Sequence, residues 1–153
     1  MIRKQYQISI HATPEKVYRF MLGLDDKQSY NDWASAFNPT STFEGSWEQG
    51  GKIYFVGTDE NGQKAGMIST ITEHVPSQMV SIKHYGFLKG EEEIVSGEEV
   101  EKWAGGMEIY RFIQENDSTK LVVDMDIVDE YLSYFDESYP KALQLLKSGV
   151  ENQ

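Results

Sequence analysis

The residues with the clearest chemical potential lie in two strand-like segments of the chain. His84 follows Ile82 at a spacing that puts both side chains on one face of an extended segment. Glu108 and Tyr110 share a face of a later segment by the same rule. If both faces turn inward, a carboxylate and an imidazole lie among aromatic rings, where they can act as a general acid–base pair or hold a polar ligand group. In the alternative, His84 lies on the outer face and Glu108 pairs with a surface cation.

Other reaction chemistries find little support in the sequence. The histidines His11, His74 and His84 form no short-spaced ligand cluster, and the chain contains no cysteine. The segment Gly50–Lys52 lacks the spacing of a phosphate-binding loop and leads into a strand-like segment. No Gly-x-Ser-x-Gly nucleophile motif is present. The sequence therefore predicts no metal site and no cofactor. A Ser-His-Asp set assembled from distant positions is left open, but no motif points to one.

Aromatic residues are numerous enough to line a ligand cavity, although core packing is the alternative for most of them. They make up 12 % of the chain. Tyrosine and tryptophan combine a large apolar body with one polar group, which suits the wall of a ligand site. We expect Trp33 and Trp103 to lie nearest the mouth of such a cavity. The candidate ligand-binding residues are Trp33, Phe37, Trp47, Phe55, His84, Trp103, Glu108, Tyr110 and Tyr139.

The charge of the chain excludes several classes of partner. There are 14 basic and 25 acidic residues, for a formal net charge of −11. A nucleic-acid-binding protein needs a basic face to neutralise phosphates, and an anionic membrane surface repels an acidic protein. No long apolar segment follows the strand-like N-terminal residues, so we expect no signal peptide and no membrane span. With no cysteine present, these features favour a cytoplasmic protein.

The longest predicted element is a helix near the C-terminal end, from Asp129 to Glu151. Its apolar residues recur at steps of three and four, which places them on one helical face. A helix of this length spans roughly 30 Å, so its apolar face must lie across another layer of the fold. Pro140 removes one backbone donor and predicts a bend or a break into two segments. The apolar face comprises Tyr131, Leu132, Phe135, Tyr139, Ala142, Leu143, Leu146 and Val150.

The remaining chain supplies mainly strands that can form this second layer. Gln5–Ile10 alternates as a half-buried strand, and Thr13 followed by Pro14 marks the start of the first of two short helices. About six more strands follow, with the clearest hairpin turn at Asn61-Gly62. Short connections make neighbouring strands antiparallel. We therefore predict a single α+β domain over residues 1–153, in which a curved six- or seven-stranded antiparallel sheet wraps around the long helix.

An acidic stretch between Lys89 and Lys102 interrupts the strand pattern. Ser96 and Glu99 have the spacing of a capping box, which predicts one helical turn. The stretch is interpreted either as a solvated loop or as a flexible lid that carries Trp103. Its charge also motivates the alternative that the protein docks on a partner protein or forms a homodimer.

Five segments resemble those of one protein superfamily in their order and spacing, nearly from end to end of the chain. They are Ile10–Tyr18, Tyr30–Trp33, Glu44–Ile53, Trp103–Tyr110 and Tyr139–Lys147. The sequence is similar to the START-like (SRPBCC) superfamily, whose members have the helix-grip fold. The most similar branch is the one named after the activator of the heat-shock protein 90 ATPase, in its small single-domain bacterial form.

This resemblance implies a cavity between the sheet and the long helix, because members of the superfamily bind lipids, sterols, polyketides or plant hormones there. A small apolar, lipid-like or polyketide-like molecule is therefore the expected partner. Since some members cyclise polyketides, the alternative is a cofactor-free cyclase or hydratase that uses Glu108, His84 or Tyr110. The heat-shock activator combines this domain with a separate chaperone-contacting domain. This chain is too short to carry both, so the family name is no proof of a co-chaperone. A stress-related, co-chaperone-like interaction protein, whose acidic surface docks on a chaperone, stays an alternative function.

Overall fold

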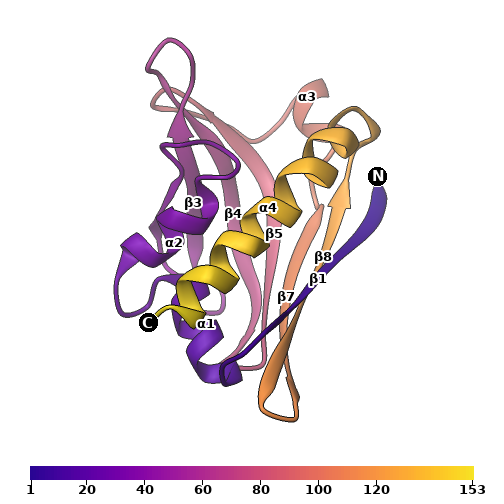
Figure 1. The fold of residues 1–153 in the computed structure, drawn as a ribbon. Coiled ribbons are helices and arrows are strands. Elements are labelled where there is room, and N and C mark those ends of the chain that lie inside the picture. The colour runs from indigo at the N-terminus through magenta and orange to yellow at the C-terminus, as the bar shows by residue number, and fades with distance from the viewer.

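An antiparallel sheet and one long helix dominate the structure, a computed structural model that describes residues 1–153 (Figure 1). The strands are β1 (Ile2–Ile10), β2 (Thr42–Gly45), β3 (Lys52–Thr58), β4 (Lys64–Val75), β5 (Met79–Lys89), β6 (Glu92–Ile94), β7 (Met107–Glu115) and β8 (Ser118–Ile127). The helices are α1 (Pro14–Leu22), α2 (Lys27–Ala34), α3 (Glu98–Glu101) and α4 (Leu132–Glu151), and a 3₁₀ turn over Asp129–Tyr131 precedes α4.

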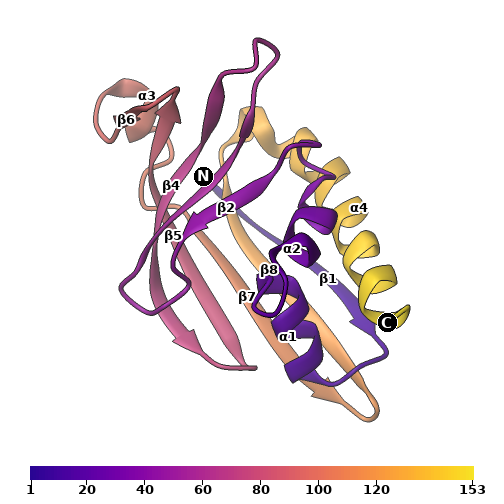
Figure 2. The same ribbon diagram turned by 90° about the vertical axis from the view of Figure 1, so that its left-hand side faces the viewer.

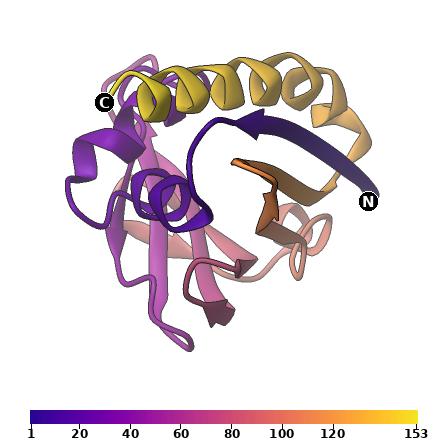
Figure 3. The ribbon, with the colours of Figure 1, turned by 60° about the horizontal axis from the view of Figure 1, so that its bottom comes forward.

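The sheet follows the order β1-β8-β7-β5-β4-β3-β2, and the short strand β6 pairs with β5 beside this path. All its paired strands are antiparallel. The first strand pairs with the last along its whole length, from Ile2 opposite Ile127 to Ile10 opposite Thr119. Figure 3 shows the strands curving around the space beneath α4. The predicted α+β fold, with a curved antiparallel sheet and a long helix across it, is confirmed.

The two short helices follow β1 and have the predicted start signals. The Thr13 hydroxyl accepts a hydrogen bond from the Lys16 N–H at 3.2 Å, and Pro14 occupies the first turn of α1. Gly23 ends α1 in the left-handed conformation, with φ of 66°, which an L-residue rarely adopts. Asp26 then caps α2 through the N–H of Gln28. Both helices pack against α4, so they close one side of the space between helix and sheet (Figure 2).

Helix α4 is a single uninterrupted helix of 20 residues, so of the bend or break predicted at Pro140 the break is wrong. Pro140 is exposed and its neighbour Tyr139 is buried, which places the proline ring on the solvent side. The Asp136 carbonyl, which loses its helical donor at this point, belongs to an exposed residue and can bond to water instead. The buried face of α4 comprises Ser138, Tyr139, Ala142, Leu143, Leu146 and Val150.

The acidic stretch contains more regular structure than the sequence indicates. Residues Glu92–Ile94 form β6 against β5, and Glu93 accepts hydrogen bonds from Lys52 at 2.8 Å and Tyr54 at 2.6 Å. Helix α3 is a single turn whose N-cap is Gly97, with no capping side-chain bond. The predicted capping box at Ser96 is therefore wrong.

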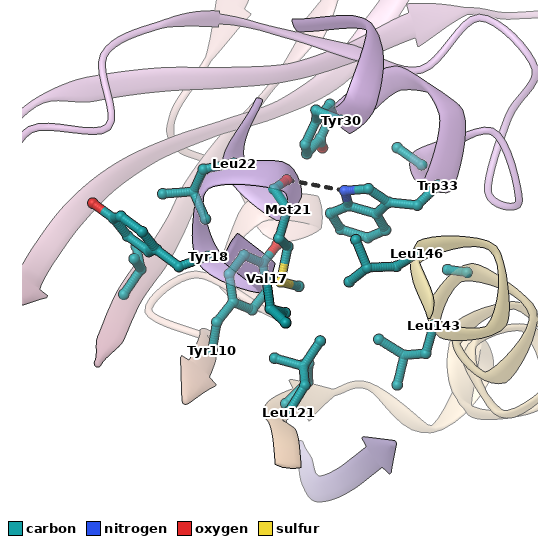
Figure 4. Close-up of a cluster of buried hydrophobic side chains, with 14 of the residues drawn as sticks. Val17, Tyr18, Met21, Leu22, Tyr30, Trp33, Tyr110, Leu121, Leu143 and Leu146 are labelled. Atoms are coloured by element: carbon teal, nitrogen blue, oxygen red, sulfur yellow. Dashed lines mark hydrogen bonds between the residues drawn. The ribbon is translucent and has the colours of Figure 1, made fainter. Parts of the chain in front are cut away.

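The main hydrophobic core lies between α4, the two short helices and the concave face of the sheet. Trp33 is nearly inaccessible, and its indole N–H donates to the Met21 carbonyl at 2.9 Å (Figure 4). This bond joins α2 to the end of α1 inside the core. No helix of the structure is both long enough and apolar enough to span a membrane. The side chains gathered around Trp33 in Figure 4 include Val17, Leu22, Tyr30, Tyr110, Leu121, Leu143 and Leu146.

Candidate functional site: a cavity beside the long helix

A cavity of about 640 Å³ lies between α4 and the sheet. Its wall is built from α2, β3, β4, β5, β7, β8 and α4, with contributions from the segments between them. Hydrophobic residues account for 19 of the 29 residues that line it, so the space is predominantly apolar. Cavities that bind small molecules commonly measure about 300–1,000 Å³.

Eight of the nine residues singled out from the sequence line this cavity, and one does not. Trp47 packs in the core instead, with ring centroids 5.4 Å from Phe43 and 5.6 Å from Phe55. Its buried indole N–H has no hydrogen-bond partner. Whether the eight lining residues bind a ligand stays a prediction. They are Trp33, Phe37, Phe55, His84, Trp103, Glu108, Tyr110 and Tyr139.

A chain of hydrogen bonds crosses the cavity wall from β4 to α4. The Ser69 hydroxyl lies 2.6 Å from His84 Nδ1, and His84 Nε2 lies 2.9 Å from Glu108 Oε1. The Tyr139 hydroxyl donates to the other carboxylate oxygen, Glu108 Oε2. The side chains of His84 and Glu108 are only 10 % and 12 % exposed. The structure thus places both on the inner face of the sheet, as the first of the two sequence interpretations requires.

Strand register brings these groups together. Glu108 on β7 lies opposite Ile82 on β5, two residues before His84 and on the same face of that strand. On the other side of β5, Ser69 lies opposite His84, and the register shifts there between Ile68 and Ser69. Such an irregularity changes which face successive side chains occupy.

This shift explains how His84 and Phe87, three residues apart, both line the cavity. In an unbroken strand they would lie on opposite faces. Sequence reasoning missed Phe87 and Ser69 for this reason. Gly86, inside an otherwise strand-like segment, was the available signal, because an isolated strand glycine often marks a bulge or a close backbone approach. A Cβ atom at Gly86 would lie 2.8 Å from the Ile94 carbonyl oxygen.

The hydrogen-bond pattern assigns Ser69 a positioning role. The Glu108 carboxylate accepts from His84 Nε2–H, so in a neutral imidazole Nδ1 accepts from the Ser69 hydroxyl. Ser69 is fully buried and does not line the cavity, so its hydroxyl cannot reach a bound molecule. The three residues resemble a nucleophilic triad in composition, but the serine is on the wrong side of the histidine to attack a ligand.

Three cavity tyrosines have strongly perturbed acidities. Burial raises the pKa of Tyr110 and Tyr139 well above the usual value, and the nearby Glu108 charge raises them further. Burial likewise raises the pKa of Tyr30, with Glu108 as the second cause. All three hydroxyls therefore stay neutral at physiological pH and remain hydrogen-bond donors.

Asp126, which also lines the cavity, is bound to the chain on two sides. Arg3 Nε donates to it at 2.6 Å, and the backbone N–H of Met107 donates at 2.9 Å. Burial alone would raise the pKa of Asp126, but the bonds from Arg3 and Met107 outweigh it, and the pKa is lowered. Asp126 thereby ties β1 and the start of β7 to β8.

Asp126→Asn is expected to lower the free energy of unfolding by about 1 kcal/mol at neutral pH, because charge-assisted bonds weaken and solvent screens part of the effect. A lowered folded-state pKa contributes stability above the ordinary aspartate pKa of about 3.9, and this contribution is lost as the pH falls below it. Urea denaturation from pH 7 to pH 3 should therefore show the two proteins converging at low pH. The matched control is Asp117→Asn, whose side chain is 83 % exposed; an equal effect there would contradict the assignment.

The other histidines lie away from the cavity. His74 Nδ1 lies 2.7 Å from the Trp47 carbonyl oxygen and Nε2 lies 2.6 Å from the Tyr18 hydroxyl, so both ring nitrogens serve the fold. The side chain of His11 is 71 % exposed. No group of three or more His, Cys, Asp or Glu side chains is arranged to hold a metal ion.

Comparison with known proteins supports the fold. No protein-family model and no curated protein sequence matches the chain. Among solved structures, the Aha1 dimer from Colwellia psychrerythraea aligns over 99 % of this chain and 97 % of its own, with a TM-score of 0.70 and 19 % sequence identity. This chain has the helix-grip fold.

Two further structures extend this likeness. A protein from Nitrosomonas europaea aligns over 99 % of this chain and 95 % of its own chain, with a TM-score of 0.73 and 12 % sequence identity. CalU16 from Micromonospora echinospora aligns over 97 % of this chain and 73 % of its own chain, with a TM-score of 0.63 and 15 % sequence identity. At these identities the likeness establishes a shared fold and transfers no activity. The helix-grip fold that the sequence resemblance implies is confirmed.

Proposed function

We propose that this helix-grip protein binds a small, mostly apolar molecule in the cavity beside α4. The observation that carries the proposal is the cavity itself, whose volume of about 640 Å³ is lined mainly by hydrophobic residues. The cavity is open to solvent at one side, and its apolar wall gains free energy when a ligand covers surface that water otherwise contacts.

The wall supports binding in two ways. Aromatic rings such as Trp33, Phe55 and Trp103 offer large apolar surfaces to a ligand body. The His84–Glu108 pair adds a buried polar group to a predominantly apolar wall, which suits a ligand that combines an apolar body with a polar group. Lipid-like and polyketide-like molecules meet this description.

Met67→Trp is expected to weaken binding of a neutral apolar probe by at least tenfold, about 1.4 kcal/mol, because the indole would occupy cavity volume. Met67 lines the cavity on β4. Nile red fluorescence titration measures the dissociation constant, and thermal shifts across a panel of sterols, fatty alcohols and polyketides identify candidate ligands. Met79→Trp, on β5 outside the cavity, is the matched control. Equal affinity in all three proteins, or no binding by the wild type, would contradict the proposal.

A second candidate function is cofactor-free acid–base catalysis, such as cyclisation or hydration of the bound molecule. It is favoured by the hydrogen bond between His84 and Glu108 inside the cavity, with Tyr110 on the same wall. The test incubates each panel ligand that binds with wild type and with His84→Gln. Product formed by the wild type alone would support catalysis, and unchanged ligand in both would contradict it.

A homodimer is a further proposal, suggested by the dimeric state named for the Colwellia structure. Sedimentation velocity at several protein concentrations tests it: a concentration-dependent shift to twice the monomer mass would support the dimer. A monomer at every concentration would contradict it.

A further inference from the structure

We propose that the ligand of this cavity is an apolar molecule with a cationic amine, which Glu108 binds, and that the cavity disfavours anionic amphiphiles. This inference rests on the proposed binding function and adds the chemical class of the ligand. It follows from the charges of the cavity wall.

The wall contains carboxylates but no lysine or arginine. Glu99, Glu108 and Asp126 all line the cavity, and His84 is the only basic side chain among the lining residues. Proteins that bind carboxylates or phosphates usually supply a cation or a fork of donors to the headgroup. A fatty acid or a phospholipid would find no such partner here.

Glu108 is the carboxylate that lacks a permanently charged partner. Asp126 is paired with Arg3 at 2.6 Å, and Glu99 is exposed and lies 3.4 Å from Lys102. Glu108 has only His84 and Tyr139 as partners, and neither of them carries a permanent charge. A charge buried without a counter-ion is costly, so a ligand cation at this point gains more than it would in water.

The Glu108 carboxylate has capacity for another donor. An ionised carboxylate offers about four lone-pair sites, and the chain uses one on each oxygen. The nearby hydroxyls of Tyr30 and Tyr110 stay neutral, because burial and the charge of Glu108 both oppose their ionisation. They add hydrogen-bond capacity at this end of the cavity without competing for the cation.

Aromatic rings of the cavity wall lie beside His84 and Tyr110, and such rings suit an ammonium group. Phe55 lies 6.0 Å from the His84 ring, and Trp33 lies 6.4 Å from Tyr110, measured between ring centroids. The faces of such rings attract cations, and the attraction is larger in a desolvated site. The net charge of −11 also raises the local concentration of cations and lowers that of anions.

The test uses three probes with one aromatic body and different polar groups: naphthylethylamine, naphthylethanol and naphthylacetate. Their affinities for the wild-type protein are measured by calorimetry at neutral pH and at two salt concentrations. We expect the amine to bind at least tenfold tighter than the alcohol, and the carboxylate to bind more weakly than the alcohol. Raising the salt should reduce this preference only partly, because salt screens exposed charges more than buried ones.

Two variants identify the group responsible. Glu108→Gln keeps the shape of the side chain and is expected to remove the preference for the amine, measured as the ratio of the amine and alcohol affinities in the same variant. Glu137→Gln, whose side chain is 75 % exposed, makes the same change in net charge and should keep the preference. Circular dichroism and thermal unfolding verify that both variants are folded.

The outcomes separate the inference from the proposed function. If the wild type binds the alcohol or the carboxylate as tightly as the amine, the inference is wrong and the binding function stands. If Glu108→Gln retains the preference, or Glu137→Gln loses it, Glu108 does not bind the amine and the inference is wrong. If none of the three probes binds, and Nile red does not bind either, the binding function itself fails.

Discussion

Replacement of Trp33 by alanine is expected to lower the free energy of unfolding by about 3–5 kcal/mol, the range measured for large buried aromatic residues. Trp33 is only 2 % exposed and contacts Tyr30 with ring centroids 5.1 Å apart. Its indole N–H also satisfies the buried carbonyl of Met21. Truncation therefore removes apolar contacts between the short helices and the cavity wall, and it leaves an unpaired acceptor as well.

Urea denaturation followed by circular dichroism measures this loss, and two variants divide it into parts. Trp33→Phe retains most of the ring area but no donor, so it should cost about 1–3 kcal/mol from the orphaned Met21 carbonyl and the smaller ring. Leu145→Ala, at a residue 46 % exposed, is the control and should stay within about 0.5 kcal/mol of the wild type. A loss below about 1 kcal/mol for Trp33→Ala would show that this core region tolerates a cavity without consequence.

The elements that could be predicted from the sequence are those specified by local chemistry. Thr13 and Pro14 mark the start of α1 whatever surrounds them, because the capping bond spans only three residues. The three- and four-residue steps of α4 identify its buried face in the same way. Once the strands alternate and their connections are short, an antiparallel sheet that packs against this helix is the simplest arrangement.

The elements that were missed depend on tertiary context. The effect of Pro140 depends on which side of α4 it occupies, and the exposed side lets water replace the missing hydrogen bond. Strand β6 is short and rich in glutamate, so its propensity is low, and it exists because β5 and Lys52 provide partners for it. Neither circumstance is encoded in the local sequence.

In the candidate site, too, some features follow from local sequence and others depend on tertiary context. The shared faces of His84 with Ile82 and of Glu108 with Tyr110 follow from strand periodicity. Periodicity does not show which face turns inward, because the sheet curvature and the position of α4 decide it. Ser69 could not be found from spacing, since it reaches His84 through an irregular pairing of two strands. Trp47 looks like the other aromatic candidates in composition, yet the turn that carries it directs it into the core.

Raising the pH above about 10, the ordinary tyrosine pKa, is expected to destabilise the protein steeply. Burial raises the pKa of Tyr30, Tyr110 and Tyr139 in the folded chain, and Glu108 raises them further. A raised folded-state pKa contributes stability that is complete below the unfolded value and is lost as the pH rises above it. Once tyrosine is ionised in the unfolded chain, each buried tyrosine lowers the free energy of unfolding by about 1.4 kcal/mol per pH unit. The three together lower it by about 4 kcal/mol per pH unit.

The ultraviolet absorbance of tyrosinate, recorded beside circular dichroism, tests this expectation directly. The buried tyrosines should ionise together with unfolding and not before it. Tyr139→Phe should reduce the slope of the free energy of unfolding against pH by the contribution of one tyrosine, about 1.4 kcal/mol per pH unit. The variant also loses the hydrogen bond to Glu108, so its stability at neutral pH should be lower. Tyr131→Phe, at a residue 45 % exposed, is the matched control. Complete tyrosine ionisation in a chain that is still folded would show that water reaches these hydroxyls freely, and the inner wall of the cavity would then not be the buried surface that the proposed ligand binding uses.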